Sequence, residues 1–319
     1  MVEGGELEFE EAKQVLRNAI EEIRKVYVGK LDVLKLAVVT LFSGGHLLIE
    51  GYPGTGKTLL AKSLSKVIRG EFKRVQGHPD ILPTDILGFH VYRLDGSKEF
   101  IKGPVFTNIL MFDELNRTPT RSQAALLEAM QEYRVTIDGV PYPLPKPFMV
   151  VATEVSPRIA AGAYQIMETL ADRFAVRVPS YYNPPEDEIE IVRKATMVVD
   201  PPISPVTTPE VVLEISSELN KLIYVSEVIN EYIVRLVNYL RNHEAVAYGP
   251  SHRASIHLSV ISRAYALMDG RDYVIPDDIK SLAVPVIAHK IKVKEEYEAE
   301  GITPESLVDE ALNKVPVPK

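Results

Sequence analysis

Residues 51–58 read GYPGTGKT and satisfy the pattern G-x-x-x-x-G-K-[S/T]. An apolar, strand-like run at 46–50 precedes them and a helical pattern follows, which is the context of a phosphate-binding loop. The glycines permit a tight backbone path that points successive N–H groups at phosphate oxygens, and the helix adds the positive end of its dipole. The alternative, an ordinary glycine-rich turn, is disfavoured once this context is counted.

Two residues at the end of this motif have chemical roles of their own. Lys57 is expected to reach the β- and γ-phosphates of a nucleotide, and the hydroxyl of Thr58 is expected to bind Mg²⁺. The residues expected to bind the nucleotide here are Gly51, Pro53, Gly54, Thr55, Gly56, Lys57, Thr58 and Leu59.

The composition narrows the class of protein. The chain has 319 residues, 46% hydrophobic and 25% charged, which predicts two globular domains. Its net charge of −8 disfavours nonspecific binding to a polyanion. The absence of cysteine excludes disulfides and thiolate metal sites, so the expected metal is nucleotide-bound Mg²⁺. With no leader pattern and no 18-residue apolar window, we expect a cytoplasmic protein without a membrane span.

Apolar β-type runs recur along the first half of the chain, separated by helical or loop segments. They occupy 46–50, 72–76, 109–113, 148–153 and 175–178. This alternation predicts an α/β fold with a five-stranded parallel sheet covered on both faces. Two hairpins, at about 90–101 and 135–144, are expected to interrupt it and to turn at Asp-Gly pairs. Surface decoration is an equally good interpretation of the first hairpin.

Helical patterns lie at both ends of this alternation. Two helices are expected ahead of it, at about 8–26 and 31–42. After residue 183 the expected helix starts are Thr208-Pro209, Ser226 and Ile275-Pro276. The expected domains are N-terminal helices plus the nucleotide-binding α/β domain at 1–183, a smaller all-helical domain at 184–292, and a loosely held tail with one short helix at 293–319.

A pair of carboxylates follows a buried strand in ILMFDELNR, residues 109–117. Asp113 can hold Mg²⁺ through water, and Glu114 can polarise the water that attacks the γ-phosphorus. The alternative for two adjacent acids after a strand is a helix N-terminal cap. A kinase would not need Glu114, because its acceptor is a substrate hydroxyl, so the pair favours hydrolysis.

Further blocks of sequence accompany these two motifs in a fixed order. They are RVQGHPDILPTDILG (74–88), GPVFTNILMFDELNR (103–117), QAALLEAMQEYRVTIDG (123–139), PYPLPKPFMVVAT (141–153), ADRF (171–174) and GPSHRA (249–254). Together with GYPGTGKT they resemble the MoxR family of AAA+ ATPases, in the helix-2-insert group, over about residues 20–290. The resemblance implies a P-loop core followed by a small helical lid domain.

The resemblance also implies roles for residues outside the two motifs. Val28 and Gly29 resemble the segment that contacts adenine. Arg173, in ADRF, resembles the arginine finger that reaches the γ-phosphate bound by a neighbouring subunit, and a structural salt bridge is its alternative. Arg253, in GPSHRA, resembles the sensor 2 arginine of the lid, with a helix-surface charge as its alternative. Whether Arg253 serves its own or the adjacent nucleotide is left open. The hairpins resemble the helix-2 and pre-sensor-1 inserts.

One segment departs from the family pattern. The family usually reads A-T-Q-N-P after its fourth core strand, where the Asn is sensor 1, and this chain reads ATEVSP at 152–157. Ser156 is the candidate to hydrogen-bond the attacking water or the γ-phosphate instead. Glu154 would place negative charge near a polyphosphate unless it points away. Slow hydrolysis is therefore expected. Gln76 is either a switch that restrains Glu114 or a simple strand-end hydrogen-bonding residue.

The resemblance implies an ATPase that works as a homo-oligomeric ring, a hexamer, and that matures or remodels partner proteins, often ones with a von Willebrand factor A domain. ATP and Mg²⁺ are the expected cofactors. One alternative is a nucleotide-gated binding and assembly module with slow turnover. Another is a nucleic-acid motor, but the second hairpin offers only Arg134 and Lys146 as cations, both at its base. The sequence therefore disfavours a nucleic-acid partner.

Overall fold

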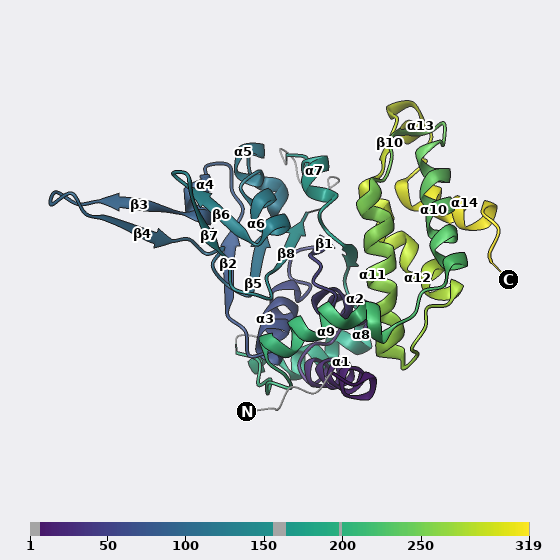
Figure 1. The fold of residues 1–319 in the computed structure, drawn as a ribbon, viewed down its shortest axis with the longest axis horizontal. Helices are drawn as coiled ribbons and strands as arrows, with labels where there is room; N and C mark the ends of the chain where they lie inside the picture. The colour runs from purple at the N-terminus through teal and green to yellow at the C-terminus, as the bar shows by residue number, and fades with distance from the viewer. Residues whose placement is uncertain (1–6, 156–163, 198–199, 319) are drawn as a thin grey trace.

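The computed structural model describes residues 7–155, 164–197 and 200–318 (Figure 1). At its centre lies a five-stranded parallel sheet with strand order β2-β5-β8-β1-β9. Its strands are β1 (Leu47–Gly51), β2 (Phe72–Gln76), β5 (Ile109–Asp113), β8 (Met149–Glu154) and β9 (Val176–Ser180). The five apolar runs of the sequence fall on these strands, so the predicted α/β fold is confirmed.

Alternate residues of each strand pack on opposite faces of this sheet. Leu47, Met111 and Val151 belong to one cluster of buried side chains. Leu48 and Phe112 belong to a second cluster on the other face. Side chains two residues apart share a face of a strand. Because both faces are covered, the central strands β5 and β8 are almost continuously apolar rather than alternately polar.

Helices of different length cover the two faces. The long helices that pack on the first cluster ahead of β9 are α1 (Phe9–Arg24), α2 (Leu31–Phe42) and α3 (Lys57–Val67). The short helices around the second cluster are α4 (Pro83–Leu87), η1 (Leu115–Arg117), α5 (Thr120–Gln123), α6 (Leu126–Glu132) and α7 (Glu168–Ala171). The carboxyl ends of β1 and β5 carry the two motifs to one edge of the sheet.

Both expected hairpins form, and they contact each other. They are β3 (Gly88–Tyr92) with β4 (Lys98–Lys102), and β6 (Arg134–Ile137) with β7 (Val140–Pro143). His90 lies 2.7 Å from a carboxylate oxygen of Asp138 and 3.0 Å from the hydroxyl of Tyr142, and the ring of Phe100 stacks on Tyr142. The β3–β4 hairpin projects away from the body of the protein (Figure 1).

Helices and one small sheet follow β9. The elements are α8 (Pro185–Arg193), η2 (Ala195–Met197), α9 (Pro209–Leu222), α10 (Glu227–Arg241), β10 (Val246–Tyr248), α11 (His252–Asp269), α12 (Pro276–Ile287), η3 (Ala288–Lys290), β11 (Lys292–Val293), α13 (Glu295–Ala299) and α14 (Pro304–Lys314). The helices α9, α10 and α12 begin at the expected positions, and Ser226 caps α10 by accepting from the backbone N–H of Ile229. Among the described residues, no helix is both long and apolar enough to cross a membrane.

The C-terminal segment is not the loosely held tail that the sequence suggested. Leu307, Val308 and Ala311 of α14 are almost completely buried, and α14 packs on α10 and α12. These apolar residues recur on one face of the helix, and burying a leucine side chain contributes about 2 kcal/mol. The expectation was wrong because it rested on the average composition of the segment. That average is dominated by the charged residues on the exposed face of α14 and does not reveal the apolar face.

Candidate active site

The loop between β1 and α3 depends on glycine at two positions. A Cβ on Gly51 would lie 1.9 Å from the carbonyl oxygen of Ser180, so β1 and β9 approach this closely only at a glycine. Gly56 has a φ of +82° and is the N-cap of α3, a conformation that costs other residues about 1 to 2 kcal/mol. The first three N–H groups of an α-helix have no acceptor within the helix, so those of Lys57, Thr58 and Leu59 could donate to a ligand at the loop.

A cavity of about 850 Å³ lies beside this loop. Its wall includes most of the residues predicted to bind the nucleotide, namely Val28, Pro53, Gly54, Thr55, Gly56, Lys57, Thr58 and Leu59. Asp113 and Glu114 also line it, so the two motifs meet in one site. Gly29 and Gly51 do not line this wall: Gly51 lies within β1, and Gly29 lies against the ring of Tyr27.

Lys57 is a half-buried cation beside two carboxylates. Its Nζ contacts the backbone carbonyl of Tyr52 and lies 3.4 Å from Oγ1 of Thr55. Burial lowers the pKa of Lys57, while the charges of Asp113 and Glu114 favour its protonated form. The ammonium group therefore provides positive charge on the cavity wall, where phosphate oxygens could replace the carbonyl as its partner.

Asp113 is held in place by two side chains that the sequence analysis did not single out. Oγ1 of Thr153 donates to its Oδ1 at 2.6 Å, and Arg74 donates to its Oδ2 at 2.6 Å. The same Thr153 oxygen accepts from the backbone N–H of Glu114 at 2.8 Å. Thr153 thus fixes the orientation of both carboxylate residues from the end of β8. Arg74 also donates to Gln76, as the strand-end interpretation of Gln76 predicts.

Glu114 has an unusual backbone conformation. Its φ of 54° and ψ of 51° are left-handed, which costs a residue with a side chain about 1 to 3 kcal/mol. Its carbonyl oxygen would lie 2.2 Å from a Cβ on Gly77, so a glycine is required opposite it. The carboxylate makes no capping hydrogen bond to η1 and pairs with Nε of Arg117 at 3.0 Å. The structure thus gives no support to the helix-cap interpretation of this residue.

The sensor 1 segment begins at the end of β8, but Ser156 lies outside the described residues. Glu154 lines the cavity. Burial and the charge of Glu50 on β1 together raise its pKa to about 7, against the opposing effect of Arg177. Its carboxyl group therefore carries less negative charge near a polyphosphate than an ordinary glutamate would. Asn116 holds the next residue, Val155, with two hydrogen bonds to its backbone, of 2.8 and 3.2 Å.

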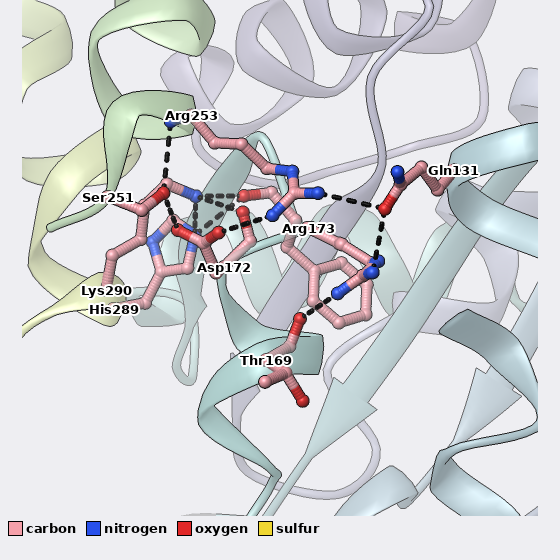
Figure 2. A network of polar contacts seen from close by, with 9 residues as sticks. Gln131, Thr169, Asp172, Arg173, Ser251, Arg253, His289 and Lys290 are labelled. Carbon is pink, nitrogen blue, oxygen red and sulfur yellow. Dashed lines mark hydrogen bonds and ion pairs between the residues drawn. The ribbon is translucent and has the colours of Figure 1, made fainter. Parts of the chain in front are cut away.

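Arg173 and Arg253 lie together (Figure 2). Neither residue lines the cavity. Both donate to Oε1 of Gln131, at 2.8 and 2.9 Å respectively. Arg253, in the first turn of α11, also pairs with Asp172 at 3.1 Å, and Arg173 donates to the carbonyl of Thr169. In the described part of the chain Arg173 makes no ion pair, which disfavours a structural salt bridge as its role.

Comparison with known proteins identifies the family. A family model described as the ATPase family associated with various cellular activities (AAA) matches residues 46–176, and an AAA lid domain model matches residues 238–311. The uncharacterized protein YeaC of Bacillus subtilis (strain 168) is 38% identical over 97% of each chain. The chaperone MoxR1 of Mycobacterium tuberculosis (strain ATCC 25618 / H37Rv) is 37% identical, over 95% of this chain and 82% of its own. The chain belongs to the MoxR family of AAA+ ATPases.

The fold of this MoxR-family protein is also found in a solved structure. A crystal structure of a candidate ATPase from Cytophaga hutchinsonii ATCC 33406 superposes with a TM-score of 0.87 and 37% sequence identity, and the match covers 98% of this chain and 97% of the other. The P-loop AAA+ core and the C-terminal helical lid are therefore confirmed.

Sequence reasoning missed four polar residues that organise the MoxR-family site. They are Arg74, Asn116, Gln131 and Thr153. One of them carried a usable signal, since Thr153 is the polar residue that ends the apolar run at 148–153. Gln131 lies in a helical stretch with many polar residues, and nothing in its local sequence distinguishes it.

Proposed function

We propose that this MoxR-family protein is a Mg²⁺-dependent ATPase that hydrolyses ATP in a ring, a hexamer by resemblance, whose subunits complete one another's active sites. One observation carries the proposal. Lys57, Asp113 and Glu114 line one cavity, whereas Arg173 and Arg253 meet at a separate place outside it. A lone subunit therefore has phosphate-binding and water-activating groups but lacks the arginines at its own nucleotide.

The cavity fits a Mg²⁺–nucleotide. Val28 lies at its wall beside Tyr27, and the carbonyl of Val28 accepts from Asn183 at 3.0 Å, which holds the segment proposed to contact adenine. No cluster of three or more His, Cys, Asp and Glu in the described residues could hold a metal by itself. This suits Mg²⁺, which keeps waters and phosphate oxygens among its ligands and takes few from protein. Thr58 and Asp113 would hold it, and bound Mg²⁺ would neutralise phosphate charge.

The residues of this chain have separate roles in the proposed hydrolysis. Lys57 and the loop N–H groups bind the phosphates. Glu114 accepts the proton of the attacking water. Thr153 holds Asp113 and the backbone of Glu114 in place through hydrogen bonds. Arg173 of a neighbouring subunit stabilises the charge that develops on the γ-phosphate, an effect worth about a thousandfold or more in related chemistry. Ser156 remains the proposed replacement for the sensor 1 asparagine.

We propose that Arg253 also acts on the adjacent nucleotide. It shares an acceptor with Arg173, and it is absent from the wall of the cavity in its own subunit. Asp172 binds its guanidinium from beside Arg173, so the two arginines would reach a neighbouring phosphate from one surface.

The proposed output is remodelling or maturation of protein partners, including ones with a von Willebrand factor A domain. It rests on family resemblance and on the name of the chaperone MoxR1. A nucleotide-gated assembly module with slow turnover is the second candidate, favoured by the missing sensor 1 asparagine. A nucleic-acid motor has little support, because Arg134 pairs with Glu128 and Glu132, and Lys146 lies over the ring of Tyr133.

The partner can be captured with a subunit that binds ATP and does not hydrolyse it. Glu114→Gln protein, purified from the native cell with ATP, is expected to retain a protein partner that the Lys57→Ala protein does not. Adding that partner to the unchanged ATPase should stimulate turnover if remodelling is the function. Turnover that is unaffected by the partner would favour the gated module, and stimulation by DNA or RNA would favour the motor.

A further inference from the structure

The backbone on both sides of Arg173 is held by one residue of the lid (Figure 2). Nζ of Lys290, in η3, contacts the carbonyl oxygen of Phe174 and lies 3.3 Å from the carbonyl oxygen of Asp172. Asp172 and Phe174 are the residues immediately before and after Arg173. A single ammonium group therefore contacts the backbone on both sides of Arg173, within the segment 172–174.

Lys290 is an unusual residue for this position. Its side chain is almost completely buried, with 4% exposed, and the partners that the structure shows are the two carbonyls and the ring of His289 at 2.9 Å. Burial lowers the pKa of Lys290 to about 7, although the nearby charge of Asp172 favours its protonated form. Burying an ammonium costs several kcal/mol, and an apolar side chain would avoid that cost. What an apolar side chain could not supply is the hydrogen bonds to the finger backbone.

The lid holds Asp172 a second time, through its side chain. Oγ of Ser251 donates to Oδ1 at 2.6 Å, and Arg253 pairs with Oδ2 at 3.1 Å. The backbone carbonyls of Asp172 and Phe174 thus contact η3, and the carboxylate of Asp172 contacts residues at the start of α11. Among the described residues, the guanidinium of Arg173 donates instead to Thr169 and Gln131 on the core. A movement of the lid would therefore displace the backbone from which Arg173 projects.

We propose that Lys290 is a positioning residue for the arginine finger: it fixes the backbone around Arg173, so that the position of the lid sets whether the finger reaches the adjacent nucleotide. The inference rests on the proposed function, in which Arg173 acts across a subunit boundary. A substitution of Lys290 should then impair the arginine finger that the subunit provides to its neighbour. It should not impair the site at which the same subunit binds ATP.

The test is Lys290→Met, which keeps length and loses every donor, with the exposed Lys294→Met as its matched control. Lys290→Met is expected to bind ATP within about twofold of the unchanged protein and to lose turnover by about tenfold or more. Lys294→Met should change neither. If Lys290→Met does not fold, Lys290→Leu, which also lacks any donor, replaces it in every step.

Mixed oligomers distinguish a positioning role from general damage. Mixed with Lys57→Ala subunits, Lys290→Met subunits should recover activity, because they have an intact loop and receive an intact finger from the neighbour. Mixed with Arg173→Ala subunits they should recover nothing, because neither type offers a working finger. Recovery in the second mixture, no recovery in the first, or turnover of Lys290→Met within about twofold of normal would overturn the inference.

The reference mixture of Arg173→Ala with Lys57→Ala separates this inference from the proposed function. If that reference mixture shows no recovery, the finger does not act in trans and the proposed function itself fails. If the reference mixture recovers and the Lys290 mixtures do not follow the expected pattern, only the role of Lys290 is wrong.

Discussion

Arg173 and Arg253 donate to the same oxygen, Oε1 of Gln131, at 2.8 and 2.9 Å (Figure 2). Two guanidinium groups so close repel each other, and burial together with Arg253 lowers the pKa of Arg173. The carboxylate of Asp172 partly compensates the positive charge of the pair through its ion pair with Arg253 of the lid. An incoming phosphate would provide further compensation, so this pair of arginines is suited to contacting an anion brought by another subunit.

Replacing Gln131 with glutamate should separate stability from activity. A carboxylate between the two guanidinium groups is expected to raise the free energy of unfolding by about 0.5 to 1 kcal/mol, since position 131 is exposed. The same ion pairs would hold both arginines away from a neighbouring nucleotide, so turnover should fall. Urea unfolding and steady-state hydrolysis measure the two effects. Gln131→Ala, the control, should lose stability slightly, and a Gln131→Glu protein with full turnover would contradict the role given to this pair.

Glu114→Gln should separate ATP binding from hydrolysis. The amide keeps the shape of the side chain but cannot accept a proton from water, so turnover should fall about a hundredfold or more while ATP affinity persists. Lys57→Ala should weaken ATP binding itself, because a phosphate contact is lost. Equilibrium binding and single-turnover assays provide the comparison. A folded Glu114→Gln protein that loses less than about threefold in turnover would rule out Glu114 as the base.

Glu154 should make stability depend on pH. Its pKa is raised from 4.5 in the unfolded chain to about 7 in the folded one. Between these values the unfolded chain loses the proton first, so the free energy of unfolding should decrease as pH rises, by at most about 3 kcal/mol. Glu154→Gln cannot ionise and should lack this decrease. Its stability gain over the parent should be larger at pH 8 than at pH 5 in urea unfolding, with turnover equal or higher. An equal difference at both pH values would argue against the shifted pKa.

The packing of α14 predicts that the C-terminal segment contributes to stability. Leu307 is 1% exposed, so Leu307→Ala should cost about 2 to 5 kcal/mol in the free energy of unfolding. The partly exposed Leu213, on α9, is a matched control whose substitution by alanine should cost well under half as much. Chemical denaturation of both variants measures the difference. Equal small losses would mean that α14 is not part of the stable fold.

The sequence predicted elements whose signals are local. The loop at 51–58 and the strands of the sheet follow from short patterns, and the starts of α9, α10 and α12 follow from proline or a capping serine. The contacts of Thr153 with Asp113 and of Gln131 with Arg253 could not be predicted in this way, because they join residues far apart in the chain. They depend on the register of neighbouring strands and on how the lid docks. The contacts of Lys290 with the backbone carbonyls of Asp172 and Phe174 also depend on how the lid docks.

The central claim is that each active site is completed by a neighbouring subunit, and a mixing titration of two inactive variants tests it most directly. Arg173→Ala subunits keep an intact loop and lack a finger, and Lys57→Ala subunits keep a finger and lack a working loop. Each alone should be nearly inactive.

Mixed rings should recover part of the ATPase activity, because some interfaces pair a good Lys57 with a good Arg173, and dilution that dissociates the ring should abolish the recovery. A titration that stays flat, in samples shown by native mass measurement to contain mixed oligomers, would contradict action across the subunit boundary.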